Sequence, residues 1–410
     1  MSYYLQTLFV AIPVFNFLIF LEMAVAYNRG LKINNAADMI SSLSSGLTNI
    51  LRDGIKLTVI VISYPWMVEN IAVFTLQPIW LAICIAFIVQ DFSGYWIHRL
   101  NHRVNILWNR HVIHHSSEEF NLACALRQSI SDTFRFSAIF MIPAALLGIP
   151  AYYFVVMGPI HLFLQFWYHT QLIDKMGFLE NVLVTPSHHR VHHAINSIYL
   201  DKNYSQIFIF WDKLFGTFQK ELKDEKPVYG ILRPAETWNP IIISYKHLWQ
   251  LLKDAWHAEK LMDKLKIWFM PTGWRPDGMK KKYPIKIITN PNEQLKYVTN
   301  NSLILLVWSW LQLFIALFLM LYLFLMMSSL ETYLIFSSAG FLFLHVFSYT
   351  SLLDGKKHAY FGEFGKMMIA FFVLNSIDFN WHGIESIFLN LFMLYLFMSM
   401  GLTKYFLKNY

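Results

Sequence analysis

The chain has 410 residues, of which 56% are hydrophobic and 14% are charged, whereas soluble globular proteins carry about 25% charged residues. This composition excludes a disordered, collagen-like or disulfide-stapled chain and favours a multi-pass membrane protein. The formal charge of +7 suits either an anionic lipid surface or nucleic acid. Because the basic excess lies in loops that flank apolar segments, the lipid surface is favoured and no nucleic-acid partner is expected.

The apolar runs predict the membrane segments, since a spanning helix needs about 20 apolar residues. The run 4–27 lacks the basic start and cleavage site of a signal peptide, so we expect a retained anchor. Gly148 and Pro150 divide the run 134–168 and predict a hairpin whose arms enter and return on the same side. The other predicted segments are 55–75, 76–96, 302–328, 333–353, the short 367–377 and 384–402.

Lys and Arg favour the cytoplasmic side of a membrane protein. They are absent from the first seven residues, while Arg29 and Lys32 follow the first span. We therefore expect the N-terminus outside and the histidine-rich segments in the cytoplasm, provided that 55–75 and 76–96 form a pair. Residues 201–300 contain no spanning run and 17 of the 33 Lys and Arg residues, which indicates a cytoplasmic cap.

These segments predict an all-α, polytopic membrane protein with a histidine-rich cytoplasmic cap. The expected organisation is an N-terminal transmembrane region at 1–87, a catalytic region at 88–235 that includes the hairpin 134–168, a cap or linker at 236–300 and a C-terminal transmembrane region at 301–410. The membrane would be the endoplasmic reticulum in a eukaryote and the inner membrane in a bacterium.

Histidine is the most informative residue type, because eleven of the sixteen histidines lie between positions 98 and 193. Positions i, i+3 and i+4 share one face of a helix, so clusters with this spacing present their imidazoles in one direction. Eight such imidazoles exceed the needs of one catalytic zinc and suit two ions with about four ligands each. The three clusters are His98-x-x-x-His102, His111-x-x-His114-His115 and His189-x-x-His192-His193.

The position of these clusters narrows the chemistry. Imidazole-rich sites suit iron, zinc or copper, and the Glu-x-x-His motif of carboxylate-bridged bundles is absent from the sequence. The clusters follow the ends of apolar runs, where an alkyl chain in the bilayer can reach them. We therefore predict that two iron ions use O2 to oxidise a lipid.

The order and spacing of the clusters resemble the fatty acid hydroxylase/sterol desaturase superfamily of membrane di-iron oxygenases. From about 88 to 235, the flanking residues resemble its alkylglycerol monooxygenase (glyceryl-ether monooxygenase) branch. The segments that carry this resemblance include Asp91-Phe92, Tyr95-Trp96, His114-His115-Ser116-Ser117-Glu118, Ala125-Leu126-Arg127-Gln128-Ser129, Thr185-Pro186-Ser187-His188-His189, Asp201-Lys202-Asn203-Tyr204 and Phe215-Gly216-Thr217-Phe218.

The resemblance implies that O2 supplies one oxygen atom to the carbon beside the ether oxygen of an alkylglycerol, which then releases an aldehyde and glycerol. It also implies tetrahydrobiopterin as the reductant. Arg103 stands where animal members carry an acidic residue, and Ser205 stands where they carry a glycine, so the electron donor stays open from the sequence alone.

Residues outside the three clusters have secondary roles in this interpretation. His169 occupies a position where the superfamily often has an extra metal ligand, although a core histidine is the alternative; His161 is expected in the core. Other residues are candidates to support a ligand imidazole or to contact the substrate, and Arg127 and Gln128 are expected near its polar head unless they anchor the chain. These candidates are Glu118, Asn121, Arg127, Gln128, His188, Asp201 and Asp212.

Two other functions remain as alternatives. A sterol or fatty-acid hydroxylase or desaturase would use the same metal site. A transporter whose histidines carry ions belongs to a different class, and it would place ionisable groups inside the spans, whereas the histidine clusters here lie at or beyond the span ends.

Overall fold

The computed structural model describes residues 3–377 and 386–410. Within these ranges the regular structure is helical apart from two short strands, β1 (Val59–Ile60) and β2 (Phe134–Arg135). The strands pair in parallel, with Val59 opposite Phe134 and Ile60 opposite Arg135. The predicted all-α class is confirmed.

Five helices of the described residues are long and apolar enough to cross a membrane, which confirms a multi-pass membrane protein. The predicted hairpin forms from shorter elements, η1 (Ser137–Met141) and α8 (Ile142–Leu146) in one arm and α9 (Ala151–Phe166) in the other. Gly148 turns the chain between them with a φ of +64°, a conformation that glycine adopts without strain. The five spanning helices are α1 (Tyr3–Asn28), α4 (Ile79–Arg103), α15 (Leu303–Met326), α16 (Thr332–Leu353) and α18 (Ser386–Lys408).

The span predicted at 55–75 is wrong. This region forms β1 and the short helix α3 (Tyr64–Ile71), and the helix that packs among the membrane helices after α1 is instead α2 (Ala36–Gly54), which contacts α15 and α16. The helix α2 is rich in serine, so its hydropathy does not reveal it. Its polar groups are satisfied inside the protein: Ser45 donates to the carbonyl of Gln128 at 2.6 Å, and Arg52 donates to the carbonyl of Ser129 at 2.6 Å.

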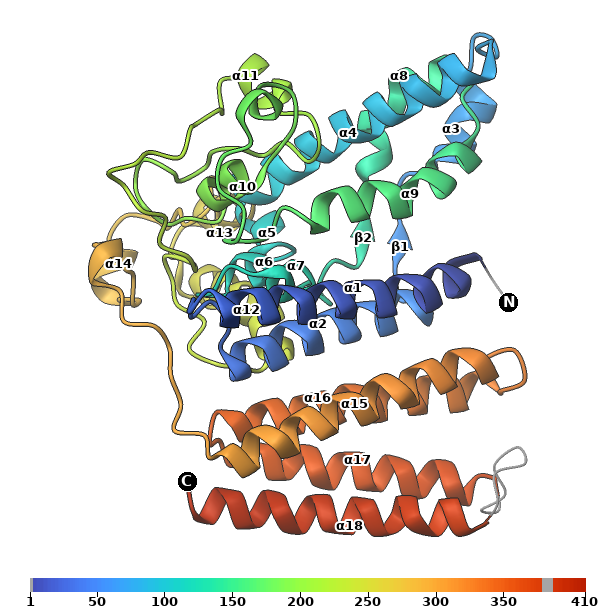
Figure 1. The fold of residues 1–410 in the computed structure, drawn as a ribbon, viewed down its shortest axis with the longest axis vertical. Coiled ribbons are helices and arrows are strands. Elements are labelled where there is room, and N and C mark those ends of the chain that lie inside the picture. Colours follow the sequence, from blue (N-terminus) through green and yellow to red (C-terminus); the bar gives the residue numbers. More distant parts are fainter. Residues whose placement is uncertain (1–2, 378–385) are drawn as a thin grey trace.

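The C-terminal region is a bundle in which α15, α16, α17 (His358–Asn375) and α18 lie side by side (Figure 1). The predicted segment 367–377 is mostly the second half of the 18-residue helix α17. Its first half carries Glu363 and Lys366, which are buried and paired at 2.8 Å. This pair explains why the apolar run in the sequence is shorter than the helix. The predicted segment 384–402 begins just outside the described residues.

Short elements of the cap gather at one end of the membrane helices, where α1, α4 and α9 end and α15 begins (Figure 1). The three consecutive lysines at 280–282 belong to α14, at the edge of this cap (Figure 1). The cap elements are α5 (Asn105–Trp108), α6 (Val112–His115), α7 (Leu122–Ala125), η2 (Gly177–Asn181), α10 (Pro186–His192), α11 (Phe210–Leu214), α12 (Pro240–His257), α13 (Leu261–Phe269), α14 (Met279–Lys282) and η3 (Pro291–Glu293).

Candidate metal centre

The three histidine clusters stand on three helices that meet in the cap. His98 and His102 occupy the last two turns of α4, the second cluster lies on and just before α6, and the third lies on and just after α10. Helix α10 begins with a capping box in which the backbone N–H of Thr185 donates to Nδ1 of His188 at 3.3 Å. His188 therefore caps this helix and stands apart from the other histidines.

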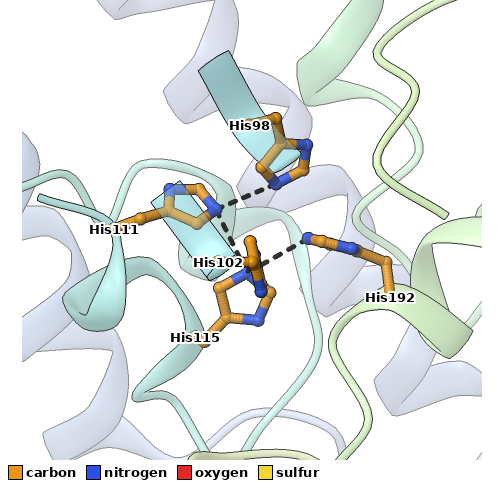
Figure 2. Close-up of side chains that lie close together, drawn as sticks. All are labelled: His98, His102, His111, His115 and His192. Carbon is orange, nitrogen blue, oxygen red and sulfur yellow. Dashed lines mark hydrogen bonds between the residues drawn. The ribbon is translucent and has the colours of Figure 1, made fainter. Parts of the chain in front are cut away.

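The predicted cluster histidines come together with His169 in two groups, and within each group the ligand atoms lie within 4.8 Å of one another. Figure 2 shows the first group, whose five rings are turned toward one another. His169 follows the returning arm of the hairpin and lies in the second group. This position is the one expected if His169 is an extra metal ligand and not a core histidine. The groups are His98, His102, His111, His115 and His192, and His114, His169, His189 and His193.

Backbone carbonyls fix the orientation of several rings. Nδ1 of His114 donates to the carbonyl of Arg127 at 3.1 Å, and Nδ1 of His169 donates to that of Gln165 at 2.9 Å. A neutral imidazole with its proton on Nδ1 keeps a lone pair on Nε2. The Nε2 atoms of these two rings are 3.3 Å apart, so two lone pairs face each other. A cation between them removes this repulsion, and the donor set therefore fits a metal ion.

Two ring nitrogens in the first group are fixed in the same way. Nδ1 of His98 donates to the carbonyl of Tyr204 at 2.7 Å, and Nδ1 of His192 donates to that of Lys202 at 2.9 Å. The Nε2 atom of His192 then faces Nε2 of His115 at 3.1 Å. Carbonyls on the other ring nitrogen are the usual outer partners of metal-bound histidines.

Burial keeps these imidazoles uncharged, which is the form that binds metal. It lowers the pKa of His114 to about 3. Burial also lowers the pKa values of His111, His115, His189 and His193 well below 6.5, with neighbouring imidazoles as a further cause. In the residues that the structure describes, both groups consist of histidine alone, a donor set that suits iron, zinc or copper better than magnesium or calcium.

Asp212 supports the first group indirectly. Its carboxylate accepts the backbone N–H groups of Tyr204 and Ser205, both at 2.8 Å, and the hydroxyl of Thr217 at 2.6 Å. The carbonyl of Tyr204 orients His98. Asp212 therefore fixes the backbone of the loop whose carbonyl orients this ligand. This placement agrees with the supporting role expected for Asp212.

Asn203 is a functional residue that the sequence reasoning missed. It lies in this loop with a positive φ of 55°, a conformation that asparagine tolerates. Its side chain donates to the carbonyls of His188 and Gln219 at 3.0 and 2.8 Å. Asn203 thereby fixes the backbone beside Lys202, whose carbonyl orients His192. The only signal in the sequence was its place within the segment Asp201-Lys202-Asn203-Tyr204.

Arg127 is buried and does not line the larger cavity beside the histidines. Its buried guanidinium pairs with Asp38 at 2.8 Å and donates to Ser42 and Ser116, which satisfies its charge inside the protein. Its carbonyl orients His114. Gln128, in contrast, lines a cavity next to the histidines.

Three other candidates lie at the border of the site. Glu118 accepts the backbone N–H of Tyr297, so it anchors the segment before α15. Asn121 accepts the backbone N–H of Cys124 at 3.1 Å as the N-cap of α7. Asp201 pairs with Arg103 at 2.8 Å, with both side chains exposed. None of the three carboxylate or amide groups makes a hydrogen bond to a cluster histidine in the described residues.

His161 lies outside both groups, as expected. Its Nε2 atom is 3.4 Å from the carboxylate of Asp91, and Gln165 contacts its Nδ1 at 2.8 Å. Asp91 is fully buried and accepts the backbone N–H groups of Ile207 and Phe208. His161 and Asp91 therefore stabilise the packing of α9, α4 and the loop before α11.

Two cavities reach the histidines. The larger, about 950 Å³, is lined by His98, His111, His114, His169 and His189 and by residues of α1, α2, α9 and α15. The smaller, about 460 Å³, is lined by His102, His115, His192 and His193 and by residues of the cap. Among the described residues, no histidine lines both cavities.

Residues 83–217 match the family model of fatty acid hydroxylase, and this range contains all nine clustered histidines. This segment is therefore similar to the fatty acid hydroxylases. The match confirms the resemblance to the fatty acid hydroxylase/sterol desaturase superfamily. The matched segment begins within α4 and ends just after α11, so α12 and the C-terminal bundle lie outside it.

Curated relatives extend the similarity beyond the matched segment. The chain is 40% identical over 271 residues to the alkylglycerol monooxygenase of Homo sapiens, which covers 65% of this chain and 59% of the relative. It is 37% identical over 291 residues to that of Xenopus tropicalis, with 69% and 63% covered. The chain thus spans about six tenths of the length of these relatives.

A more distant relative is the ornithine lipid hydroxylase of Rhizobium tropici, 29% identical over 154 residues, with 38% of this chain and 46% of the relative covered. No solved structure matches the chain.

Proposed function

We propose that this chain is a membrane-bound, non-haem di-iron monooxygenase that cleaves the ether bond of alkylglycerols. In the proposed reaction O2 supplies the oxygen that hydroxylates the carbon beside the ether oxygen, and the resulting hemiacetal breaks down to an aldehyde and glycerol. The observation that carries the proposal is the larger cavity, which connects five of the clustered histidines with the membrane helices. The 40% identity to alkylglycerol monooxygenase favours an ether lipid as the substrate.

Each histidine group would hold one iron ion. The first group offers five imidazoles and the second offers four, which suffices for two ions with room for O2. Bound iron would supply the one-electron chemistry that activates O2. The protein's own contribution is to keep the imidazoles neutral, to orient them through backbone carbonyls and to exclude water from a buried site.

The larger cavity suits an alkyl chain that enters from the bilayer. Phe20 on α1, Leu162 on α9 and Phe314 on α15 line it and are 53%, 54% and 50% exposed, so the cavity opens between helices toward lipid. Burying an alkyl chain in water-free surroundings contributes about 0.8 kcal/mol per CH₂ group. Affinity would therefore come mainly from the tail.

Polar side chains that line the same cavity suit the glycerol head. Arg110, Gln128 and Asp132 are among them, and Arg110 immediately precedes His111 in the chain. Hydroxyl groups of glycerol can donate to Asp132 and accept from Arg110 or Gln128. With the head held here and the tail between the helices, the carbon beside the ether oxygen would stop near the histidines, and this position would select the bond that reacts.

The cytoplasmic orientation is also a proposal. The C-terminal end of α1, the cap and the start of α15 lie at the same end of the membrane helices (Figure 1). Arg29 directly follows α1, and basic residues favour the cytoplasmic side. The active site would then face the cytoplasm, from the endoplasmic reticulum in a eukaryote or the inner membrane in a bacterium. The domain boundaries at 87, 235 and 300 remain proposals with it.

The reductant is proposed to be tetrahydrobiopterin, because the resemblance to alkylglycerol monooxygenase favours it. A sterol or fatty-acid hydroxylase or desaturase is the second candidate function, favoured by the 25% identity over 167 residues to a Delta(7)-sterol 5(6)-desaturase of Gibberella zeae.

Product analysis separates the two functions. Detergent-purified protein would be supplied with O2, tetrahydrobiopterin and either 1-O-hexadecylglycerol, hexadecanoic acid or a sterol. The proposal expects hexadecanal from the ether substrate alone. A hydroxylated or desaturated acid or sterol, with no aldehyde, would support the second function instead.

A further inference from the structure

The smaller cavity lies within the cap and reaches the histidines separately from the larger one. It touches His102, His115, His192 and His193, and the larger cavity touches none of these four. Its remaining walls come from α5, α6, α12 and loops of the cap, not from α1, α2, α9 or α15. The lipid would fill the other cavity, so the smaller one has no role in the proposed binding of the substrate.

The balance of the proposed reaction, on which this inference rests, requires a second small molecule. Hydroxylation converts a C–H bond, O2, two electrons and two protons into a C–OH group and water. The C–H bond of the lipid does not provide these two electrons, so a separate reductant must supply them. A reductant that enters through the cap can reach the histidines without displacing the lipid.

One wall of the smaller cavity is a continuous polar network. Arg233 donates to Gln250 at 2.6 Å, Gln250 donates to Asp254 at 2.7 Å, and Arg275 makes two hydrogen bonds to Asp254 at 2.7 and 2.8 Å. Lys246 adds a third cation and donates to the carbonyl of Ala235 at 2.6 Å. The lining of the cavity thus carries three cations, Arg233, Lys246 and Arg275, against two carboxylates, Asp201 and Asp254, and this excess of donors favours a ligand that presents carbonyl or other acceptor groups.

The lining of the same cavity also offers aromatic surfaces beside the histidines. Trp108 and Trp274 both line the cavity. The ring centre of Trp108 lies 4.9 Å from that of His102 and 5.6 Å from that of His115. A flat ring that stacks on Trp108 would therefore lie next to two imidazoles of the first histidine group.

We propose that this cavity binds the electron donor, a small reduced nitrogen heterocycle of the pterin type, and that Arg233, Gln250 and Trp108 recognise it. The cavity of about 460 Å³ is of a size that takes a small molecule. The polar network binds the heteroatom edge of the ring, and Trp108 binds its face. The lipid and the electron donor thus enter the enzyme from different sides.

Binding measured under anaerobic conditions tests this assignment without turnover. Isothermal titration calorimetry of the purified, iron-loaded protein with tetrahydrobiopterin should show one site. Arg233→Ala, Gln250→Leu and Trp108→Leu should each weaken this binding about tenfold or more, and Arg233→Lys should recover part of the loss. Lys253→Ala is the matched control, because Lys253 is exposed on the same helix as Gln250, and it should leave binding unchanged.

Iron content and hexadecylglycerol affinity should stay unchanged in all four cavity variants, which shows that each variant is folded. The inference is overturned if tetrahydrobiopterin does not bind, if the three variants bind it as tightly as the wild type, or if hexadecylglycerol competes with it. Binding that depends on Arg233 together with no aldehyde release would instead refute the proposed ether cleavage and leave the reductant site standing.

Discussion

The Nε2 atoms of His114 and His169 face each other at 3.3 Å, although the Nδ1 atom of each ring is already used as a donor to a backbone carbonyl. With the protons on Nδ1, both Nε2 atoms present lone pairs. Burial also opposes a positive charge on either ring. The pair is therefore arranged for a metal ion and is unfavourable without one.

Replacing one ligand of the first group should abolish turnover without affecting membrane insertion. His115 and His192 lie in the cap, outside the membrane helices, and they contact each other at 3.1 Å. We expect His115→Ala and His192→Ala each to lose aldehyde release from hexadecylglycerol, while membrane fractionation stays as in the wild type. Near-normal turnover in either variant would show that the ligand assignment is wrong.

Removing the charge of Asp212 should weaken metal binding from a distance. Its carboxylate holds the backbone of Tyr204 and Ser205, and the carbonyl of Tyr204 orients His98. Changes to such outer partners typically cost about 10–100-fold in metal affinity, so Asp212→Asn should lower iron affinity by that factor in competition with a chelator. The control is Asp174→Asn, whose side chain is 94% exposed, and equal affinities in the two variants would contradict this role.

The length of the alkyl chain should decide how tightly a substrate binds. At about 0.8 kcal/mol per CH₂ group, each carbon removed should weaken binding about fourfold, while the same ether carbon reacts. Leu317→Trp narrows the larger cavity between α15 and its neighbours, so it should raise KM for hexadecylglycerol more than for a short-chain ether. If short water-soluble ethers turn over as efficiently as long ones, the substrate reaches the histidines from water and not from the bilayer.

Metal-depleted protein should lose stability as the pH falls below 6.5. Burial lowers the pKa of His114 to about 3, so between pH 6.5 and 3 this histidine takes up a proton when unfolded but not when folded. Proton uptake then favours the unfolded state. The free energy of unfolding is therefore highest above pH 6.5, where His114 is neutral in both states, and it decreases as the pH falls. Thermal unfolding of metal-depleted protein in detergent should show this loss, and a melting temperature constant from pH 7 to pH 5 would contradict it.

The sequence was sufficient for the membrane class and for the set of histidines, because both depend on local patterns. Apolar runs mark α1, α4, α15, α16 and α18, and the spacing of the three histidine clusters places their rings on common faces. His169 could be proposed only through the resemblance, because a single histidine at the end of an apolar helix has no distinguishing spacing.

The remaining features depend on contacts that are distant in the sequence. Helix α2 packs against α15 and α16, and its Ser45 and Arg52 find hydrogen-bond partners at 128–129; no hydropathy pattern reports such partners. The groups that orient His98 and His192 are backbone carbonyls, which every residue possesses. The smaller cavity combines residues from 102 to 287, so its walls could not be assembled from any one motif.

The central claim, a histidine-bound di-iron site, is tested most directly by metal analysis of protein purified in detergent under anaerobic conditions. We expect about two iron atoms per chain in the wild type, and about one in His169→Ala, since this change removes one of four imidazoles from the second group. His257→Ala is the control, because His257 is exposed on α12, and it should retain both ions. A wild-type protein that holds one zinc ion and no iron would contradict the account.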